Sequence, residues 1–131
     1  MDPDSCNLPL EKSSNDDFVL GAFENNILIG VIGLKREKKY SVGHKATIWG
    51  LVILPEYRNQ GIGNELVKSL LNKVSANHEI EFVRAIVTVT QKNAIPIFES
   101  HGFRKYGLES RGIKDGEIFY DQAFLMKDIR D

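Results

Sequence analysis

The chain has 131 residues, of which 42% are hydrophobic and 27% charged, and these values fit one globular domain and exclude a disordered protein. Its 17 basic and 18 acidic residues leave a net charge of −1, so the overall field favours neither nucleic acid nor an acidic membrane surface as a partner. The only cysteine is Cys6, which excludes a disulfide framework and a cysteine-based metal site.

Residues 1–17 are polar, contain two prolines and show no periodicity, so we expect a flexible N-terminal arm. We expect residues 18–131 to form one domain. The sequence shows no secretory leader and no apolar run long enough to span a bilayer, which favours a cytoplasmic protein with no membrane partner.

Strands are predicted at residues 18–24 and 27–37, joined into a hairpin by a tight turn at Asn25-Asn26. A charged loop separates this hairpin from a third strand at residues 45–54. The end of the third strand is so apolar that we expect both of its faces to be covered.

A helix is predicted from Ile62 to about Asn77, because apolar residues recur every three or four positions through Leu66 and Leu70. The β-branched run at residues 82–89 follows this helix and predicts a buried strand.

A short helix is predicted from Asn93 to His101, with Asn93 as its N-terminal cap and Gly102 closing it. A final hairpin around Asp115-Gly116 ends the domain. The order of elements predicts an α/β fold whose middle is a right-handed strand–helix–strand crossover.

The segment PEYRNQGIG, residues 55–63, joins the third strand to the long helix. Pro55 ends the strand, and two glycines fall in the first helical turn, where backbone N–H groups lack intrahelical partners. Glycine lets a ligand approach these groups, the helix dipole favours an anion, and Arg58 can add a charge-assisted contact. The spacing therefore indicates either a phosphate site or a plain surface turn.

Two well-known phosphate loops do not fit this segment. A Walker loop needs Lys-Ser/Thr after its second glycine, where this chain has Asn64-Glu65. The dinucleotide fingerprint needs a third glycine at the position of Leu66. The sequence thus argues against an ATPase and against an NAD enzyme.

The stretch WGLVILPEYRNQGIGNELV resembles motif A of the GNAT superfamily of acyl-CoA-dependent N-acetyltransferases. Its signature is Arg/Gln-x-x-Gly-x-Gly/Ala after a strand, and the matching residues are Arg58, Gly61 and Gly63. The resemblance extends from about Phe18 to Met126 and implies a mixed, mostly antiparallel sheet with a central crossover.

The stretch NAIPIFESHGF resembles the second motif of the same family, with Ala94, Phe98, Gly102 and Phe103 in the matching places. The two motifs stand in the family's order, with a predicted strand between them.

The resemblance implies acetyl-CoA as the co-substrate and no metal. Main-chain N–H groups at the start of the long helix would hold its pyrophosphate, and the pantetheine arm would lie along the end of the third strand like an added strand. A main-chain N–H where the parallel strands separate would act as the oxyanion donor. The residues that the resemblance assigns to the cofactor are Leu51, Val52, Ile53, Arg58, Asn59, Gln60, Gly61, Ile62, Gly63, Asn64, Gln91 and Phe98.

Three features depart from the family pattern. Many members have a tyrosine at Phe98 that protonates the departing thiolate, although a thiol of pKa about 8.5 can leave without an acid. The family favours asparagine at Gln91. Members also begin with a strand and two helices that cover the acceptor site, and here these are missing or reduced. Whether the chain is truncated, has a minimal wall, or borrows the wall from a neighbouring subunit stays open.

The acceptor amine must lose a proton before it attacks, because an amine of pKa about 10 is charged at neutral pH. Glu24 and His44 are candidate bases, each with a solvated or structural role as the alternative. Tyr120 and Asp121, on the final strand, are candidates for acceptor binding. We assign no catalytic residue from the sequence.

The remaining aromatic and histidine residues are interpreted as structural. The aromatics expected in the core rather than in a substrate box are Trp49, Phe82, Phe103 and Phe119. His78 and His101 flank helix ends and are interpreted as caps or surface residues. The three histidines are not spaced as a metal site.

The sequence therefore predicts an N-acetyltransferase that moves an acetyl group from acetyl-CoA to a small primary amine or a peptide by direct attack in a ternary complex. No cysteine lies near the site to form an acyl-enzyme. The alternative is a non-catalytic acyl-CoA-binding module, which Phe98 and the thin N-terminal region favour. A plain phosphate-binding or interaction domain would leave the second motif unexplained. Because family sheets often pair between subunits, the resemblance also allows a homodimer.

Overall fold

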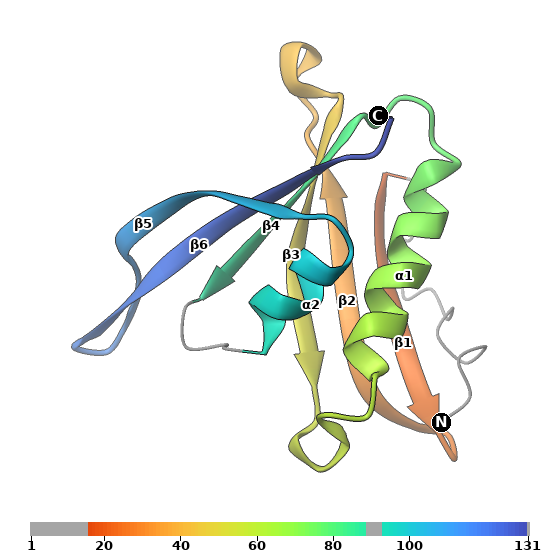
Figure 1. Cartoon of the computed structure of the whole chain (residues 1–131), viewed down its shortest axis with the longest axis vertical. Helices are drawn as coiled ribbons and strands as arrows, with labels where there is room; N and C mark the ends of the chain where they lie inside the picture. Colours follow the sequence, from red (N-terminus) through yellow and green to blue (C-terminus); the bar gives the residue numbers. More distant parts are fainter. Residues whose placement is uncertain (1–15, 89–92, 131) are drawn as a thin grey trace.

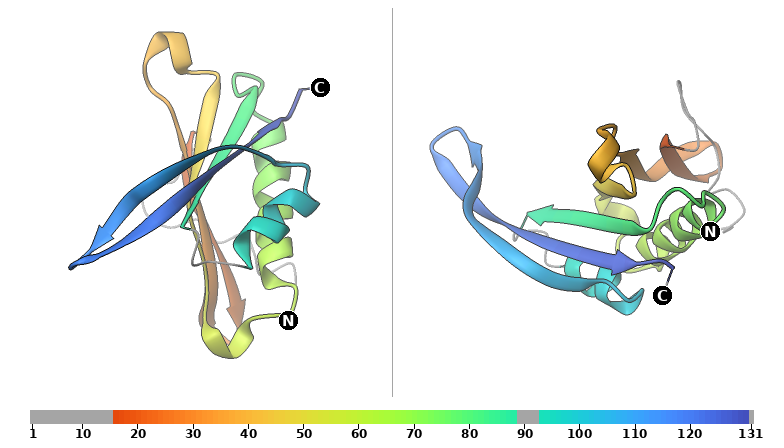
Figure 2. Two further views of the ribbon diagram at one scale, coloured as in Figure 1. Left: turned by 60° about the vertical axis from the view of Figure 1, so that its left-hand side comes forward. Right: turned by 90° about the horizontal axis from the view of Figure 1, so that it is seen from above.

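The computed structural model describes residues 16–88 and 93–130. Six strands form one sheet in the order β1-β2-β3-β4-β6-β5, and α1 and α2 lie on one face of it (Figures 1 and 2). The elements are β1 Asp17–Glu24, β2 Ile27–Arg36, β3 Lys45–Ile53, α1 Ile62–Ser75, β4 Phe82–Thr88, α2 Ala94–Ser100, β5 Arg104–Asp115 and β6 Ile118–Asp128. This order confirms the predicted one. Cys6, Gln91 and the arm up to residue 15 lie outside the described residues.

Both predicted hairpins are present. Asn25 and Asn26 join β1 to β2 with φ values of 51° and 66°, the left-handed geometry that a type I′ turn requires and that asparagine tolerates. The turn between β5 and β6 is made by Gly116 and Glu117, one position later than predicted. Gly116 has a φ of 63°, and glycine adopts this conformation without the steric cost that a side chain would bring.

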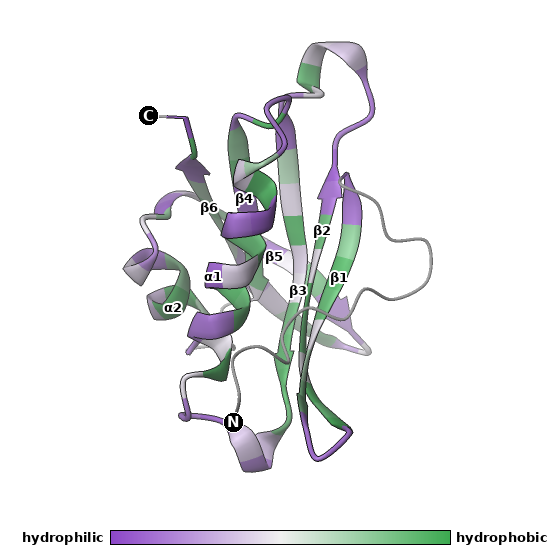
Figure 3. Cartoon of the chain, turned by 90° about the vertical axis from the view of Figure 1, so that its right-hand side faces the viewer, coloured by the Kyte–Doolittle hydropathy of each residue, from purple (hydrophilic) through white to green (hydrophobic). Residues whose placement is uncertain are grey.

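Helix α1 buries one apolar stripe against the sheet, as its periodicity predicts. The buried residues of the helix are Ile62, Gly63, Leu66, Val67, Leu70 and Val74. Figure 3 shows the alternation of polar and apolar residues along α1 beside the apolar strands. Full burial of a Leu or Val side chain contributes about 1.5–3 kcal/mol to the free energy of folding relative to an exposed one. This stripe therefore supplies the main packing contact between α1 and the sheet.

The strand–helix–strand crossover is confirmed, with α1 connecting the parallel strands β3 and β4. Their pairing runs only from Lys45↔Phe82 to Ile48↔Ala85, although both strands continue further. The other strand pairs are antiparallel, so the sheet is mixed and mostly antiparallel. Beyond Ile48 and Ala85 the two parallel strands separate.

The prediction that both faces of the third strand are covered at its end was wrong. Val52 is 54% exposed, because the helices cover only one face of the sheet and β3 has parted from β4. The same one-sided cover explains β4, which was predicted as a buried strand. It buries Val83, Ala85 and Val87 and leaves the alternate residues half-buried.

The predicted cap of α2 is only partly present. Asn93 occupies the cap position, but its backbone is already helical (φ −84°, ψ −17°) and its side chain makes no capping hydrogen bond. A side-chain cap normally needs an extended backbone at that position. Gly102, with a φ of 92°, follows the end of the helix as predicted.

The aromatic residues divide between core and surface. Phe103 is buried against Phe98, with ring centroids 5.2 Å apart, and Phe82 is half-buried against the ring of His44. Trp49 and Phe119 are 58% and 40% exposed, so the prediction that they belong to the core was wrong. Trp49 lies on the face of the sheet that has no helix, whereas Phe119 lies on the projecting β5–β6 arm.

Candidate active site

The loop between β3 and α1 is built by residues that suit its sharp turn. Pro55 begins a short 3-10 turn, Pro55–Tyr57, because its fixed φ suits a helical start and it has no N–H to lose. Asn59 and Gly61 then take positive φ values of 64° and 82°. These are residue types that tolerate left-handed backbone, and they allow α1 to begin at Ile62.

The start of α1 presents N–H groups that the described chain does not use. Glu65 donates the first backbone hydrogen bond of the helix, to Gly61 O at 3.1 Å. Within residues 16–88 and 93–130, no acceptor meets the backbone N–H groups from Asn59 to Asn64. The positive end of the helix dipole lies at the same place, so the loop is suited to an anion.

The two glycines of this loop have different roles. Gly61 is exposed, and a Cβ built on it would meet nothing within 4 Å, so this position leaves the backbone open to a ligand. Gly63 is buried, and a Cβ there would come within 2.8 Å of Ile97 Cδ1. The glycine at position 63 therefore lets α2 pack closely against α1, a role that the sequence analysis did not recognise.

A groove of ≈ 610 Å³ runs from this loop along the end of β3 and beside α2. Nine of the residues assigned to the cofactor line it, namely Leu51, Val52, Ile53, Arg58, Asn59, Gly61, Ile62, Gly63 and Asn64. Gln60 does not line it, and its side chain donates instead to Glu56 O at 3.2 Å. The sequence analysis missed Tyr57, Asn93, Ala94, Pro96 and Ile97 as lining residues.

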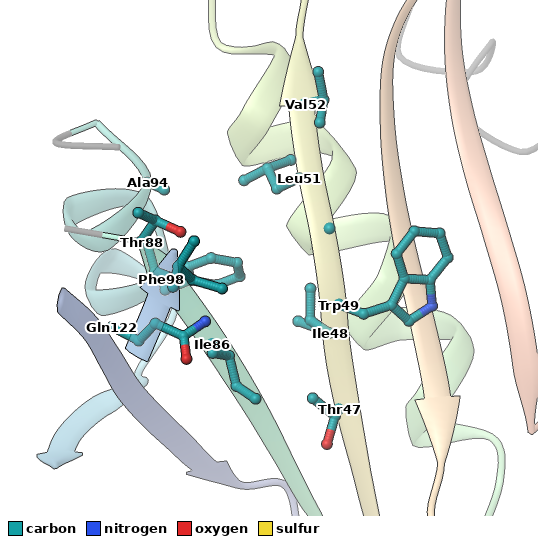
Figure 4. A pocket seen from close by; sticks show the side chains of 13 residues that line it. Thr47, Ile48, Trp49, Leu51, Val52, Ile86, Thr88, Ala94, Phe98 and Gln122 are labelled. Carbon is teal, nitrogen blue, oxygen red and sulfur yellow. The ribbon is translucent and has the colours of Figure 1, made fainter. Parts of the chain in front are cut away.

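A second cavity, of ≈ 410 Å³, lies where β3 and β4 separate (Figure 4). It shares Leu51, Val52 and Ala94 with the groove, so the two spaces adjoin. Phe98 lines this cavity rather than the groove and is only 2% exposed. The other lining residues are Thr47, Ile48, Trp49, Gly50, Ile86, Val87, Thr88, Ile113 and Gln122.

The candidate bases do not line either space. Glu24 ends β1 beside the Asn25-Asn26 turn, and His44 packs its ring against Phe82, with ring centroids 5.7 Å apart. Among the described residues that line the cavity, none carries an ionisable side chain. The described lining of the cavity therefore supplies no candidate base in addition to Glu24 and His44.

Neither candidate for acceptor binding on the final strand lines the cavity or the groove. Gln122 pairs with Thr88 and lines the cavity, whereas Tyr120 pairs with Ile113 further out on the arm. The Asp121 carboxylate accepts a hydrogen bond from the Arg111 backbone N–H at 2.9 Å and lines neither space. Only the pairing register with β4 identifies Gln122, and composition carries no signal for it.

Two further findings concern metals and membranes. In the described ranges, no group of three His, Cys, Asp or Glu side chains is arranged to hold a metal ion. No described helix combines the length and the apolar character that crossing a bilayer demands.

His101 links the two helices beside the groove, and it predicts a pH dependence of stability. Its Nε2 lies 3.2 Å from Asn64 Oδ1, and burial, followed by the charge of Lys127, lowers the pKa of His101 below its ordinary value of 6.5. The unfolded chain therefore binds the proton first as the pH falls. The free energy of unfolding is expected to fall from pH 6.5 towards the lowered pKa of the folded chain.

The measurement is urea denaturation of the wild-type chain and of His101→Gln at several pH values between 5 and 7.5. The wild-type chain should lose more stability than the variant as the pH falls through this window. Identical pH dependence of the two chains would contradict the assignment.

Comparisons with known proteins agree with this geometry. The model of the Acetyltransferase (GNAT) family matches residues 2–103. This match begins before Phe18 and ends at Phe103, so it includes both motifs but not the β5–β6 arm. No curated protein sequence matches the chain.

Solved structures of similar fold come from several bacteria. A GNAT-family acetyltransferase from Streptococcus pneumoniae is 25% identical, with a TM-score of 0.80 over 88% of this chain and 68% of that one. A GNAT superfamily phosphinothricin acetyltransferase from Sinorhizobium meliloti, in complex with acetyl-CoA, is 19% identical, with a TM-score of 0.77 over 87% of this chain and 62% of that one. The ribosomal-protein-S18-alanine N-acetyltransferase from Escherichia coli is 16% identical, with a TM-score of 0.75 over 89% and 72% of the two chains.

Proposed function

Since the chain belongs to the GNAT acetyltransferase family, we propose that it transfers an acetyl group from acetyl-CoA to a primary amine by direct attack in a ternary complex. The observation that carries this proposal is the row of unused N–H groups from Asn59 to Asn64, which opens into a groove that leads to the separation of β3 and β4. The neighbour from Sinorhizobium meliloti, which has the same fold, was solved with acetyl-CoA.

The fit of acetyl-CoA rests on two features of this chain. The N–H groups at the start of α1 suit the pyrophosphate, with Arg58 beside them. Leu51, Val52 and Ile53 pair with β2 on one side only, so their other edge can hydrogen-bond the pantetheine amides as an added strand would. When bound, acetyl-CoA supplies the activated acyl thioester.

The transfer forms a nitrogen–carbon bond and breaks the carbon–sulfur bond, while the amine gives up a proton. A main-chain N–H at the separation of β3 and β4 would stabilise the oxyanion. Phe98 has no proton to give to the departing sulfur, so the thiolate leaves unaided, which its pKa of about 8.5 permits. Because none of the described residues that line the cavity has an ionisable side chain, the amine enters unprotonated or gives its proton to water.

The fold alone does not determine which class of amine accepts the acetyl group, so the acceptor class is part of this proposal. Neighbours of the same fold are named for phosphinothricin and for an alanine of a ribosomal protein. A small amine and a peptide are therefore both compatible with the architecture. The homodimer and the cytoplasmic location stay predictions.

The test combines thermal unfolding with thiol release. Acetyl-CoA at about one hundred times its Kd should stabilise the chain by roughly 2.7 kcal/mol. Addition of a panel of primary amines should then release the thiol of CoA. Stabilisation without thiol release from any amine would favour the alternative, a non-catalytic acyl-CoA-binding module, for which the missing hydroxyl at Phe98 is the supporting observation. Absence of stabilisation would count against both.

Removing Arg58 is expected to weaken acetyl-CoA binding moderately. The side chain is exposed and lines the groove, so Arg58→Ala should raise the Kd by about tenfold at low salt and by less at high salt. Isothermal titration at two salt concentrations measures this. The control is Lys39→Ala, which removes one exposed cation outside the groove. If Arg58→Ala and Lys39→Ala raise the Kd equally, Arg58 acts only through the overall surface charge and makes no specific contact with acetyl-CoA.

A further inference from the structure

A row of three polar side chains crosses the sheet from its β5 edge to the cavity where β3 and β4 separate. Glu109 of β5 pairs with Gln122 of β6, and Gln122 pairs with Thr88 of β4. Residues directly opposite each other on neighbouring strands place their side chains on the same face of a sheet. The row ends at the cavity, because Gln122 and Thr88 both line it.

Gln122 brings a carboxamide into this cavity. Figure 4 shows its amide group directed into the space between β4 and β3, which Phe98 also lines. A carboxamide offers two N–H donors and one acceptor oxygen. Within residues 16–88 and 93–130, no residue forms a hydrogen bond with the Gln122 side chain, so these groups are available to a ligand.

A bulge in β5 lies beside Gln122. Three residues of β5, 110–112, stand opposite the single residue Asp121 of β6. The Asp121 carboxylate accepts a hydrogen bond from the Arg111 backbone N–H at 2.9 Å, and Arg111 has a φ of 57°. A bulge redirects the side chains around it, and this hydrogen bond holds the bulge in one geometry.

Gly112, in this bulge, leaves the space in which the carboxamide rests. A Cβ at this position would come within 2.8 Å of Gln122 Oε1 and within 2.6 Å of Glu109 Oε1. The ends of both side chains therefore lie close together over the glycine, where a larger residue would displace them. Gly112 thus positions Gln122, and it brings the Glu109 carboxylate beside the carboxamide.

Glu109 adds a negative charge next to Gln122. Among the described residues it forms no ion pair, and two cations of the same arm, Arg111 and Lys114, lie over the ring of Phe119 instead. An unpaired carboxylate attracts an ammonium group, and salt weakens this attraction at an exposed position. The charge therefore favours the approach of a protonated primary amine.

From these observations we infer that Gln122 hydrogen-bonds the nitrogen of the acceptor amine, that Gly112 positions its carboxamide, and that Glu109 attracts the ammonium form of the amine. This inference rests on the proposed function. The cavity shares Leu51 and Val52 with the groove, so a molecule held by Gln122 lies next to the place where the thioester would be. Gln122 contacts the acceptor, whereas Gly112 acts through Gln122.

Gln122→Leu tests the contact with the full chain and acetyl-CoA. The acceptors are 2-phenylethylamine, ethanolamine and the peptide trialanine. Leucine is similar in size to glutamine but cannot hydrogen-bond, so KM for each accepted amine should rise about tenfold. The factor should be similar for all accepted amines, because Gln122 contacts the nitrogen that they share, and the Kd of acetyl-CoA should not change. An unchanged KM, or an equal rise in the Kd of acetyl-CoA, would overturn the inference.

Gly112→Ala tests the positioning role. It should raise KM for the same amines by about three- to tenfold without lowering the unfolding temperature, because the atoms that must move are the ends of two flexible side chains. An unchanged KM in this variant would refute the positioning role of Gly112.

Glu109→Gln tests the charge. It should raise KM by about threefold at low salt and by less at high salt. The matched control is Glu117→Gln, which makes the same change at an exposed acid of the same arm, outside both spaces, and should change nothing. An equal rise in both variants would show that the overall charge, and not the place of Glu109, attracts the amine.

A binding measurement without turnover separates this inference from the proposed function. With CoA in place of acetyl-CoA, isothermal titration of the three amines should show a Kd that rises about tenfold in Gln122→Leu. Such binding without thiol release would leave the amine site standing and refute the transferase. Thiol release with the same KM and Kd in the wild-type chain and the variant would refute the role of Gln122 and leave the transferase standing. The absence of both binding and thiol release for all three amines would refute the two together.

Discussion

Replacing Gly61 with aspartate is expected to abolish acetyl-CoA binding at concentrations that saturate the wild-type chain. Gly61 lies at the N-terminal cap of α1 with free space at the position of its missing Cβ, so a carboxylate fits there without a clash. It would place a negative charge beside the unused N–H groups, where it repels the pyrophosphate. We expect the Kd to rise by at least about one hundredfold, equivalent to roughly 2.7 kcal/mol, as measured by isothermal titration.

The matched control is Gly61→Asn. Asparagine has the shape of aspartate without its charge, and both pay a similar cost for the φ of 82° at this position. The asparagine variant should keep its affinity within about tenfold of wild type. The aspartate variant should unfold at the same temperature as the asparagine variant or higher, because a negative charge at the start of a helix interacts favourably with the helix dipole.

Two results would contradict this account of the loop. Wild-type affinity in Gly61→Asp would show that the N–H groups of α1 do not hold the pyrophosphate. An equal loss in both variants would show that backbone geometry at position 61, rather than charge, controls binding.

Replacing Leu66 with alanine is expected to cost about 3 kcal/mol of unfolding free energy, within the range of 2–5 kcal/mol for buried leucines. Leu66 is fully buried, and its Cδ1 lies against Gly30 of β2, so the shorter side chain leaves a hole between α1 and the sheet. A domain of this size has a total stability of roughly 5–15 kcal/mol, so the loss is a large fraction of it. Urea denaturation measures the change.

The control for this prediction lies on the same helix. Lys68→Ala removes an exposed side chain and should stay within about 0.5 kcal/mol of the wild type. If Leu66→Ala lowers the free energy of unfolding by less than about 1 kcal/mol, the apolar stripe of α1 is not the main packing contact between helix and sheet. Because α1 also carries the N–H groups of the groove, a partly unfolded Leu66→Ala chain would bind acetyl-CoA more weakly as well.

The secondary structure follows closely from local rules. The two asparagines predict the β1–β2 turn because they tolerate positive φ, and the spacing of Ile62, Leu66 and Leu70 predicts α1. The loop before α1 is identified as an anion site by Gly61 and by its place at a helix start. These features depend on residues within a few positions of one another, so they can be predicted from the sequence.

The predictions that failed concern exposure and register. Val52 and Trp49 are as apolar as core residues, and only the arrangement of both helices on one face of the sheet leaves them exposed. Pairing register likewise decides that Gln122 lines the cavity, because it lies opposite Thr88, whereas acceptor binding by Tyr120 or Asp121 stays a prediction. Residue type cannot reveal which of two faces a helix will cover.

The sequence by itself determined the order of the elements, the residues of the β1–β2 turn and the family to which the chain belongs. The tertiary structure alone decided that β3 and β4 part after Ile48 and Ala85, that Gly63 serves the contact between the helices, and that Trp49 rests on Gly33. The physical reason is the range of the interactions. Periodicity and turn chemistry act between near neighbours, whereas a strand separation or a ring on a distant backbone needs contacts between residues far apart in the chain.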